Sequence, residues 1–266
     1  MRFRLPILLA AILLPNPALA QTAAEPEEEE PICADRPGIA SSTCTVPESR
    51  VQVELAVDWS FQDDGGDRSD TLLAGDTLVR VGVGKRTELQ FGWTAYGRLR
   101  DRIAGIRSRD DSAGDAMIGV RHRFFEQGDV SAAVQGRLLL PIGGAAIGAG
   151  DWGFDLEVPV EIALGSSYFL FTPALSATPD ADRRGRHLSY GMAAGFGFEL
   201  FEGWSIQADL AVYRDDDPLG ASIEALAGLG LAFAVSNNLQ LDLGATIGLN
   251  RDSPDFGLYV GAASRF

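Results

Sequence analysis

The chain has 266 residues, of which 46% are hydrophobic and 22% are charged, and its formal net charge is −15. A chain this apolar can bury a core, which excludes disorder throughout. The negative charge argues against nucleic acid as a partner, because a protein that binds it needs a basic surface to neutralise phosphates. Two histidines and two cysteines leave little for a metal site or for thiol chemistry, and we expect no cofactor.

Residues 1–20 have the features of a secretory signal peptide. Arg2 and Arg4 precede an apolar run over residues 5–14, and Ala18-Leu19-Ala20 forms a cleavage site of small residues. The apolar run is shorter than the roughly 20 residues that span a bilayer as a helix, so an uncleaved anchor is the less favoured alternative. The sequence therefore predicts export.

Residues 21–50 form an acidic segment that we expect in the periplasm. The glutamates at 27–30 lie between two prolines and repel one another, so this part should stay solvated. Cys33 and Cys44 have ten residues between them, and in an oxidising compartment we expect them to form a disulfide. The sequence leaves open whether this segment plugs the domain that follows it.

From Val51 onward, apolar and polar residues alternate with a period of two, which is typical of strands with one apolar and one polar face. Twelve segments carry this alternation: 51–62, 70–84, 87–98, 113–125, 129–140, 151–164, 167–178, 187–200, 203–214, 221–235, 238–249 and 255–266. Tight turns alternate with longer, mostly charged loops between them. The pattern predicts an all-β fold, a 12-stranded antiparallel transmembrane β-barrel of the outer-membrane type over residues 51–266.

The charges indicate which face meets lipid. No Asp, Glu, Lys or Arg falls on the apolar face of the twelve segments, and an Arg or Lys there would cost about 2–4 kcal/mol at mid-bilayer. Trp59, Trp93, Trp152 and Trp204 lie on the apolar face near strand ends, where aromatic side chains meet lipid headgroups. A soluble sandwich or a barrel packed on its interior is the alternative, but a closed sheet of this many strands is too wide to fill.

Two stretches of the chain carry a family resemblance. Residues 35–38 (DRPG), 45–47 (TVP) and 50–54 (RVQVE) lie before and at the start of the first predicted strand, and residues 250–255 (NRDSPD) precede the last one. They resemble the two ends of a family of outer-membrane transporters named for a meta-cleavage pathway of phenol degradation. The resemblance spans essentially the whole barrel, and it implies a bacterial outer-membrane location and a transport role. The link to phenol is not carried over to this chain.

The ends of the chain add two further observations. Cys33, Cys44 and the acidic leader depart from the family pattern. Phe266, the last residue, lies on the apolar face and resembles the C-terminal signal that bacterial barrel-assembly machinery recognises. We therefore expect this machinery, outer-membrane lipid and lipopolysaccharide as partners.

Charged residues on the polar face divide into two sets. The candidate lumen residues of the second to fifth strands are all basic: Arg80, Arg98, Arg121, Arg123 and Arg137. Those of the sixth to eleventh strands are acidic, and the candidates are Asp155, Glu157, Glu161, Asp209, Glu224 and Asp242. In a closed barrel the two sets would face each other, and their transverse field would make the pore selective. The alternative is a lumen closed by salt bridges to acids on neighbouring strands, namely Glu54, Asp58, Glu88 and Asp115.

Three further patterns permit other chemistry. His187 and Ser189 share one face of a strand, as in an outer-membrane phospholipase, but no asparagine lies on a neighbouring strand to orient the histidine. The aspartates at 110–111 and 215–217 could bind divalent ions, although solvated acidic loops are commoner and we assign no metal site. Arginines 98, 100, 102, 107 and 109 of the longest loop either pair with lipopolysaccharide phosphates or fold inward as a constriction.

The sequence favours a passive outer-membrane channel for small solutes, aromatic or hydrophobic ones included, rather than an enzyme. One alternative is a structural or surface-interaction barrel with a closed lumen. A less favoured alternative is an outer-membrane lipid hydrolase.

Overall fold

The computed structural model describes residues 31–266, so the predicted signal peptide and the glutamates at 27–30 lie outside the described residues. Within that part, no helix is long and apolar enough to cross a membrane. The described chain is all β-structure joined by turns and loops.

The strands follow one another along the chain with short connections. The first seven are β1 (Val51–Asp64), β2 (Asp67–Gly84), β3 (Thr87–Ile103), β4 (Ile106–Ser112), β5 (Ala116–Gln127), β6 (Val130–Leu140) and β7 (Gly153–Glu157). The others are β8 (Val160–Leu164), β9 (Ser167–Pro179), β10 (Arg186–Phe201), β11 (Trp204–Asp215), β12 (Ser222–Ser236), β13 (Leu239–Gly248) and β14 (Phe256–Arg265).

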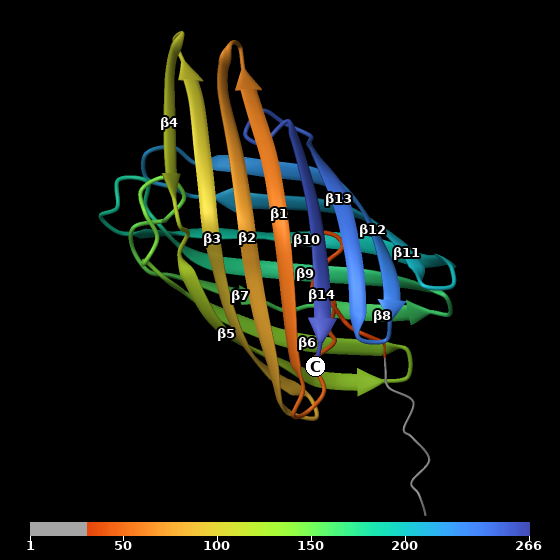
Figure 1. The fold of residues 1–266 in the computed structure, drawn as a ribbon. Helices are drawn as coiled ribbons and strands as arrows, with labels where there is room; N and C mark the ends of the chain where they lie inside the picture. The colour runs from red at the N-terminus through yellow and green to blue at the C-terminus, as the bar shows by residue number, and fades with distance from the viewer. Residues whose placement is uncertain (1–30) are drawn as a thin grey trace, which may run out of the picture.

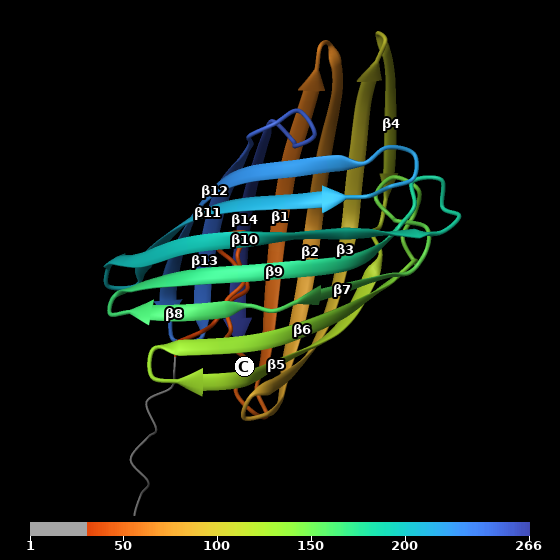
Figure 2. The same ribbon diagram turned by 180° about the vertical axis from the view of Figure 1, so that it is seen from behind.

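These strands close into an antiparallel barrel (Figures 1 and 2). β1 pairs with β14, and apart from β4, β7 and β8 the strands pair with their neighbours in chain order, β3 pairing with β5. β7 and β8 occupy a single place between β6 and β9, and β4 pairs only with β3. The wall therefore has twelve strand positions, which confirms the predicted 12-stranded barrel.

The position shared by β7 and β8 is interrupted at Val158 and Pro159. Proline has no N–H to donate, so it weakens the ladder where it stands within a sheet. The wall stays connected there, because Val158 N donates to Pro173 O at 3.1 Å and Pro159 O accepts from Ala133 N at 2.9 Å. The predicted segment 151–164 is thus one strand position with a break in it.

The two ends of the barrel differ. The turn end carries the tight turns and the junction of β1 with the C-terminus, where Val51 N donates to Phe266 O. The loop end carries the long connections, and the β1–β2 and β3–β4 hairpins rise well beyond the rest of the wall there (Figure 1). Gly128, Gly165 and Gly203 of the tight turns have φ values of 57°, 73° and 77°, which only glycine adopts without strain.

The outer face of the wall is apolar and the inner face is polar. Leu55, Trp93 and Leu241 are 48%, 39% and 47% exposed. Glu54 and Arg121, which point the opposite way, are fully buried. A water-soluble fold would bury the leucines and expose the ions, so this arrangement is that of a barrel surrounded by lipid.

Candidate functional site

The interior of the barrel holds part of the chain itself. Residues 33–47, here called the lumen segment, lie inside the wall before β1 begins. Cys33 and Cys44 are joined by a disulfide with their Cα atoms 6.3 Å apart, which closes residues 33–44 into a ring, here called the disulfide loop. The described part of the segment predicted in the periplasm is therefore within the barrel rather than beside it.

The lumen segment contacts all twelve strand positions of the wall. Most contacts are polar, and the wall partners are Glu54, Arg80, Glu88, Arg121, Ser131, Glu157, Glu161, Thr172, Asp209, Asp242 and Tyr259. On the other two positions, Ala40 packs with Ala193 of β10, and Pro37 lies against Gly230 of β12. A segment held all round in this way narrows the lumen.

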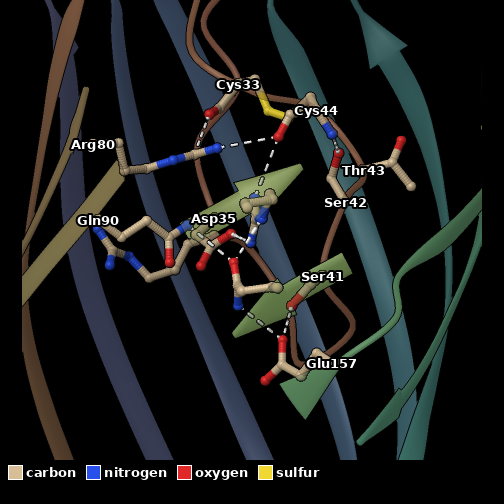
Figure 3. Close-up of polar contacts among 12 residues, drawn as sticks. Cys33, Asp35, Ser41, Ser42, Thr43, Cys44, Arg80, Gln90 and Glu157 are labelled. Atoms are coloured by element: carbon tan, nitrogen blue, oxygen red, sulfur yellow. Dashed lines mark hydrogen bonds and ion pairs between the residues drawn. A yellow bond between two sulfur atoms is a disulfide. The ribbon is translucent and has the colours of Figure 1, made fainter. Parts of the chain in front are cut away.

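Arg80 of β2 is the most completely bonded of these partners (Figure 3). Its Nε and Nη2 donate to both carboxylate oxygens of Glu88, at 2.8 and 3.0 Å. Its Nη1 donates to Glu54 at 3.1 Å and to the Cys33 carbonyl at 2.7 Å, and its Nη2 also reaches the Cys44 carbonyl at 3.2 Å. All five N–H groups of the guanidinium thus have acceptors, so this buried cation ties the wall to the base of the disulfide loop.

Arg121 of β5 makes a second connection of the same kind. Its Nη2 lies 2.5 Å from Asp35 Oδ1 of the disulfide loop, and its Nε donates to Gln135 Oε1 at 2.6 Å. Its Nη1 lies 3.4 Å from the Cys44 carbonyl oxygen. The predicted basic side of the lumen is therefore occupied in large part by the loop.

The acidic side of the lumen binds residues 41–43 of the loop, which directly precede Cys44. Glu157 accepts a hydrogen bond from Ser41 Oγ at 3.3 Å and forms an ion pair with Arg137. Glu161 accepts from Ser42 Oγ and from the backbone N–H of Thr43, at 3.0 and 3.2 Å. The two predicted charge sets thus hold one segment between them instead of facing each other across open space.

Glycines on the wall leave room for the lumen segment. A Cβ on Gly230 would lie 2.5 Å from the Cβ of Pro37, and one on Gly195 would lie 3.2 Å from the Cβ of Ala40. Glycine in a strand interior commonly marks a place where another piece of backbone approaches closely. These glycines are therefore part of the site.

A cavity of about 580 Å³ lies beside the loop, within the lumen. Six carboxylates and two guanidinium groups line it: Asp35, Asp58, Asp76, Asp115, Asp155 and Glu157, with Arg36 and Arg137. Both cations have partners, since Arg36 Nε lies 3.0 Å from Asp242 Oδ1 and Arg137 pairs with Glu157. The charged part of the cavity lining is therefore predominantly acidic.

Family comparisons agree with this architecture. A family model described as "Putative MetA-pathway of phenol degradation" matches residues 34–266. The chain belongs to this family. The resemblance seen at the two ends of the sequence is thereby confirmed, and the matched region includes most of the lumen segment together with the whole barrel.

Solved structures show the same fold. An outer-membrane channel from Pseudomonas putida F1 superposes with a TM-score of 0.73 at 15% identity, covering 87% of this chain and 99% of that one. The KdgM porin gives a TM-score of 0.51 at 8% identity over 81% of this chain and 99% of its own. The NanC porin gives 0.51 at 7% identity over 79% and 98%. No curated protein matches the chain.

Several predicted lumen residues of this family member have no hydrogen bond or ion pair with the lumen segment as the structure describes it. Arg123 lies near the turn end, where it lines a hollow together with Cys33 and Cys44, and it pairs with Glu126 at 3.1 Å. Glu224 is half-buried on β12, opposite Tyr213 of β11. Asp155 lines the cavity but has no basic side chain within 4.0 Å in the part of the chain that the structure describes.

Arg98, contrary to expectation, belongs to the β3–β4 hairpin at the loop end. It pairs with Asp111 at 2.8 Å. The strand register places it opposite Leu72, which lies opposite Trp59 on the lipid-facing side. The face reverses because Gly75 is an extra residue on β2: Ala56 lies opposite Asp76, but Val57 lies opposite Ala74.

His187 does not form a catalytic pair with Ser189. Its ring nitrogens lie 2.9 Å from Asp180 Oδ1 and 2.7 Å from Asp215 Oδ1, so both face carboxylates. Within the described chain, Asp180, His187 and Asp217 are the only group close enough together to hold a metal ion, and they lie at the loop end. We attribute no chemistry in the lumen to this group.

Sequence reasoning did not find the residues of the disulfide loop that face the wall. Asp35, Arg36 and the hydroxyl groups of residues 41–43 supply its side-chain contacts with the wall. Their signal was present, because a short ring with both charges and three successive hydroxyl groups is chemically complementary to a charged wall. Nothing in the alternation of the strands indicates it.

Proposed function

We propose that this barrel is a passive channel for small solutes in a bacterial outer membrane, and that the lumen segment limits what passes. The observation that carries the proposal is the acidic cavity beside the disulfide loop, inside a closed wall with a polar interior. The similarity of its fold to the Pseudomonas putida channel and to two porins supports the proposal. We place the loop end outside the cell, as is usual for outer-membrane barrels with short periplasmic turns.

The cavity favours cations among these solutes. Asp58, Asp76 and Asp155 have no basic side chain within 4.0 Å among the described residues, whereas both lining arginines are paired. Uncompensated carboxylates at a narrow place raise the local concentration of cations and repel anions. This lining gives less support to the aromatic or hydrophobic solutes that the sequence left open.

The test is conductance of the purified full-length protein in planar bilayers under a salt gradient. We expect a reversal potential that shows preference for K⁺ over Cl⁻. The double variant Asp58→Asn/Asp76→Asn should lose most of that preference. As a control, Asp64→Asn/Asp110→Asn removes two exposed acids of the long hairpins and should keep it. A preference that is unchanged in the first variant would contradict the role of the cavity.

A barrel with a closed lumen is the second candidate. It is favoured by the contacts of the lumen segment with all twelve strand positions. The same recordings distinguish the two functions through Gly230→Val, in which the new side chain would collide with Pro37 and displace the segment. A silent wild type with a conducting variant would support the closed barrel. If neither protein conducts, the channel proposal fails.

A further inference from the structure

The outer part of the β2–β3–β4 sheet carries a concentration of arginines on one face. Residues directly opposite each other in antiparallel strands share a face. One row across β1 to β4 is Trp59, Leu72, Arg98 and Asp111. The next is Phe61, Asp70, Arg100 and Arg109, and the last is Asp63, Arg68, Arg102 and Arg107. We call the six arginines of these rows the arginine face.

The arginine face has an excess of positive charge. It holds six arginines and three aspartates, a net charge of +3, in a chain whose net charge is −15. Arg100 lies opposite Arg109, and Arg102 lies between Arg68 and Arg107. Like charges directly opposite each other destabilise a sheet, and the three aspartates, which pair with four of the six arginines, offset this only in part.

Two of these guanidinium groups are available to an anion. Arg100 and Arg107 have no carboxylate within 4.0 Å among the described residues. They are exposed and line a hollow of about 640 Å³ in which five arginines outnumber two aspartates; its other charged residues are Arg68, Arg102, Arg109, Asp70 and Asp101. A guanidinium is planar and can donate two parallel hydrogen bonds to a phosphate, so a group of them fits a phosphorylated ligand.

The position of the face identifies the source of the phosphate. The Cζ atom of Arg68 lies 4.3 Å from the centre of the Phe61 ring. That ring also packs with Trp59 and Phe256. Leu258 of β14 lies opposite Trp59 and is an exposed apolar residue on the outer side of the barrel. The arginines therefore continue the lipid-facing surface beyond its aromatic rim, rather than the lining of the lumen.

We propose that the arginine face binds the phosphate groups of a glycolipid in the outer leaflet, with the acyl chains against the aromatic surface below it. Arg100 and Arg107 donate to the phosphate oxygens, which take the place of the carboxylate partners that these two arginines lack among the described residues. The proposal is independent of whether the lumen conducts, because this face lies on the outside of the barrel.

The test measures binding of bisphosphorylated lipid A to the folded full-length protein in detergent. We expect Arg100→Gln/Arg107→Gln to raise the Kd by about tenfold or more, since each hydrogen bond from a charged donor to the lipid is lost. The matched control is Arg184→Gln/Arg251→Gln, which removes two exposed loop-end arginines that are in no ion pair. It should change the Kd less than twofold. Heat-dependent gel mobility checks that each variant is folded.

Two further arms separate the possible outcomes. Lipid A from which both phosphates have been removed should bind the wild type about tenfold more weakly or worse, and inorganic phosphate should not displace the intact lipid. Equal losses in the two double variants, or undiminished binding of the dephosphorylated lipid, would overturn the proposal. If free phosphate displaced the lipid at a concentration equal to the Kd of the lipid, the ligand would be a soluble anion, and this too would overturn the proposal.

Discussion

Replacing Arg80 by methionine removes the cation that joins the barrel wall to the base of the disulfide loop. Methionine has a similar length and no donor. The substitution leaves the carboxylate of Glu88 buried without a cation, and it leaves Glu54 with only Arg36, whose Nη2 lies 3.9 Å away. It also removes the N–H groups that donate to the carbonyls of Cys33 and Cys44, at N···O distances of 2.7 and 3.2 Å. The wall and the loop are thus both affected.

The expected loss of stability follows from this geometry. Removing one partner of a buried ion pair costs about 3–5 kcal/mol, because the remaining charge is uncompensated. Water can enter a lumen more easily than a packed core, so we expect a value near the lower limit, about 3 kcal/mol. For a domain of this size, such a loss lowers the melting temperature by roughly 6–12 °C.

Two assays measure the effect. Heat-dependent gel mobility gives the unfolding temperature, and bilayer recordings show whether the loop has moved, in which case conductance should rise. In Glu54→Gln/Arg80→Met/Glu88→Gln no charge is left unpaired, so most of the lost stability should return while the loop stays loose. An unchanged unfolding temperature and conductance in Arg80→Met would refute the inference that this guanidinium anchors the loop.

Three other perturbations test separate parts of the molecule. Replacing Cys33 and Cys44 by serine opens a ring of 12 residues, for which loop entropy predicts a loss of about 3 kcal/mol and noisier open-channel currents. Gly230→Val should release the lumen segment and raise conductance, because the first atom added would lie 2.5 Å from the loop's proline. Asp217→Asn should make the loop at 180–185 more sensitive to trypsin. Backbone N–H groups, first that of Ala181, hold the pKa of Asp217 below its usual value. The ionised carboxylate therefore stabilises the loop fully at pH values above the usual pKa of an aspartate, and this stabilisation is lost only in stronger acid.

Each of these has a matched control. Dithiothreitol should reproduce the effect of the two serines in the wild type and have none in the double variant. Gly220→Val adds the same side chain where nothing lies within 4 Å, and it should leave the currents unchanged. Asp216→Asn alters the neighbouring acid, which bonds to Arg214 of the adjoining strand, and trypsin sensitivity should stay as in the wild type. A control that behaves like its test variant would contradict the corresponding mechanism.

The wall could be predicted from the sequence because lipid imposes a strict rule on it. Each strand must present apolar side chains at alternate positions, and an ion on that side is costly, so the period of two in the sequence is unusually clear. The same rule placed Arg80 and Arg121 inside, where the structure has them. It also merged β7 and β8 correctly into one segment, since their faces continue across Pro159.

The partners of the inward charges could not be predicted in the same way. Alternation determines the side of the wall on which a residue lies, but it contains no information about which group fills the space opposite. Asp35 is 86 residues from Arg121 in the chain, and no local pattern connects the two. The glutamates at 27–30 predict that the leader stays solvated, but they contain no information about the polar ring that follows them.

The single residue Gly75 explains why Arg98 lies on the outer face of the wall and not in the lumen, where it was predicted. With a φ of 66° it lies in the left-handed region that glycine adopts readily, and it adds one residue to β2 against β1. On the turn-end side of Gly75, Arg80 lies opposite Gln52, and both point into the lumen. On the loop-end side, Arg68 lies opposite Asp63, and both share the outer face with Phe61. One shift of register thus places Arg68 and Arg80 on opposite faces of the wall, although both are even-numbered residues of the same strand. Arg80 bonds to the chain's own loop, whereas Arg68 belongs to the outer face that we propose to bind a glycolipid.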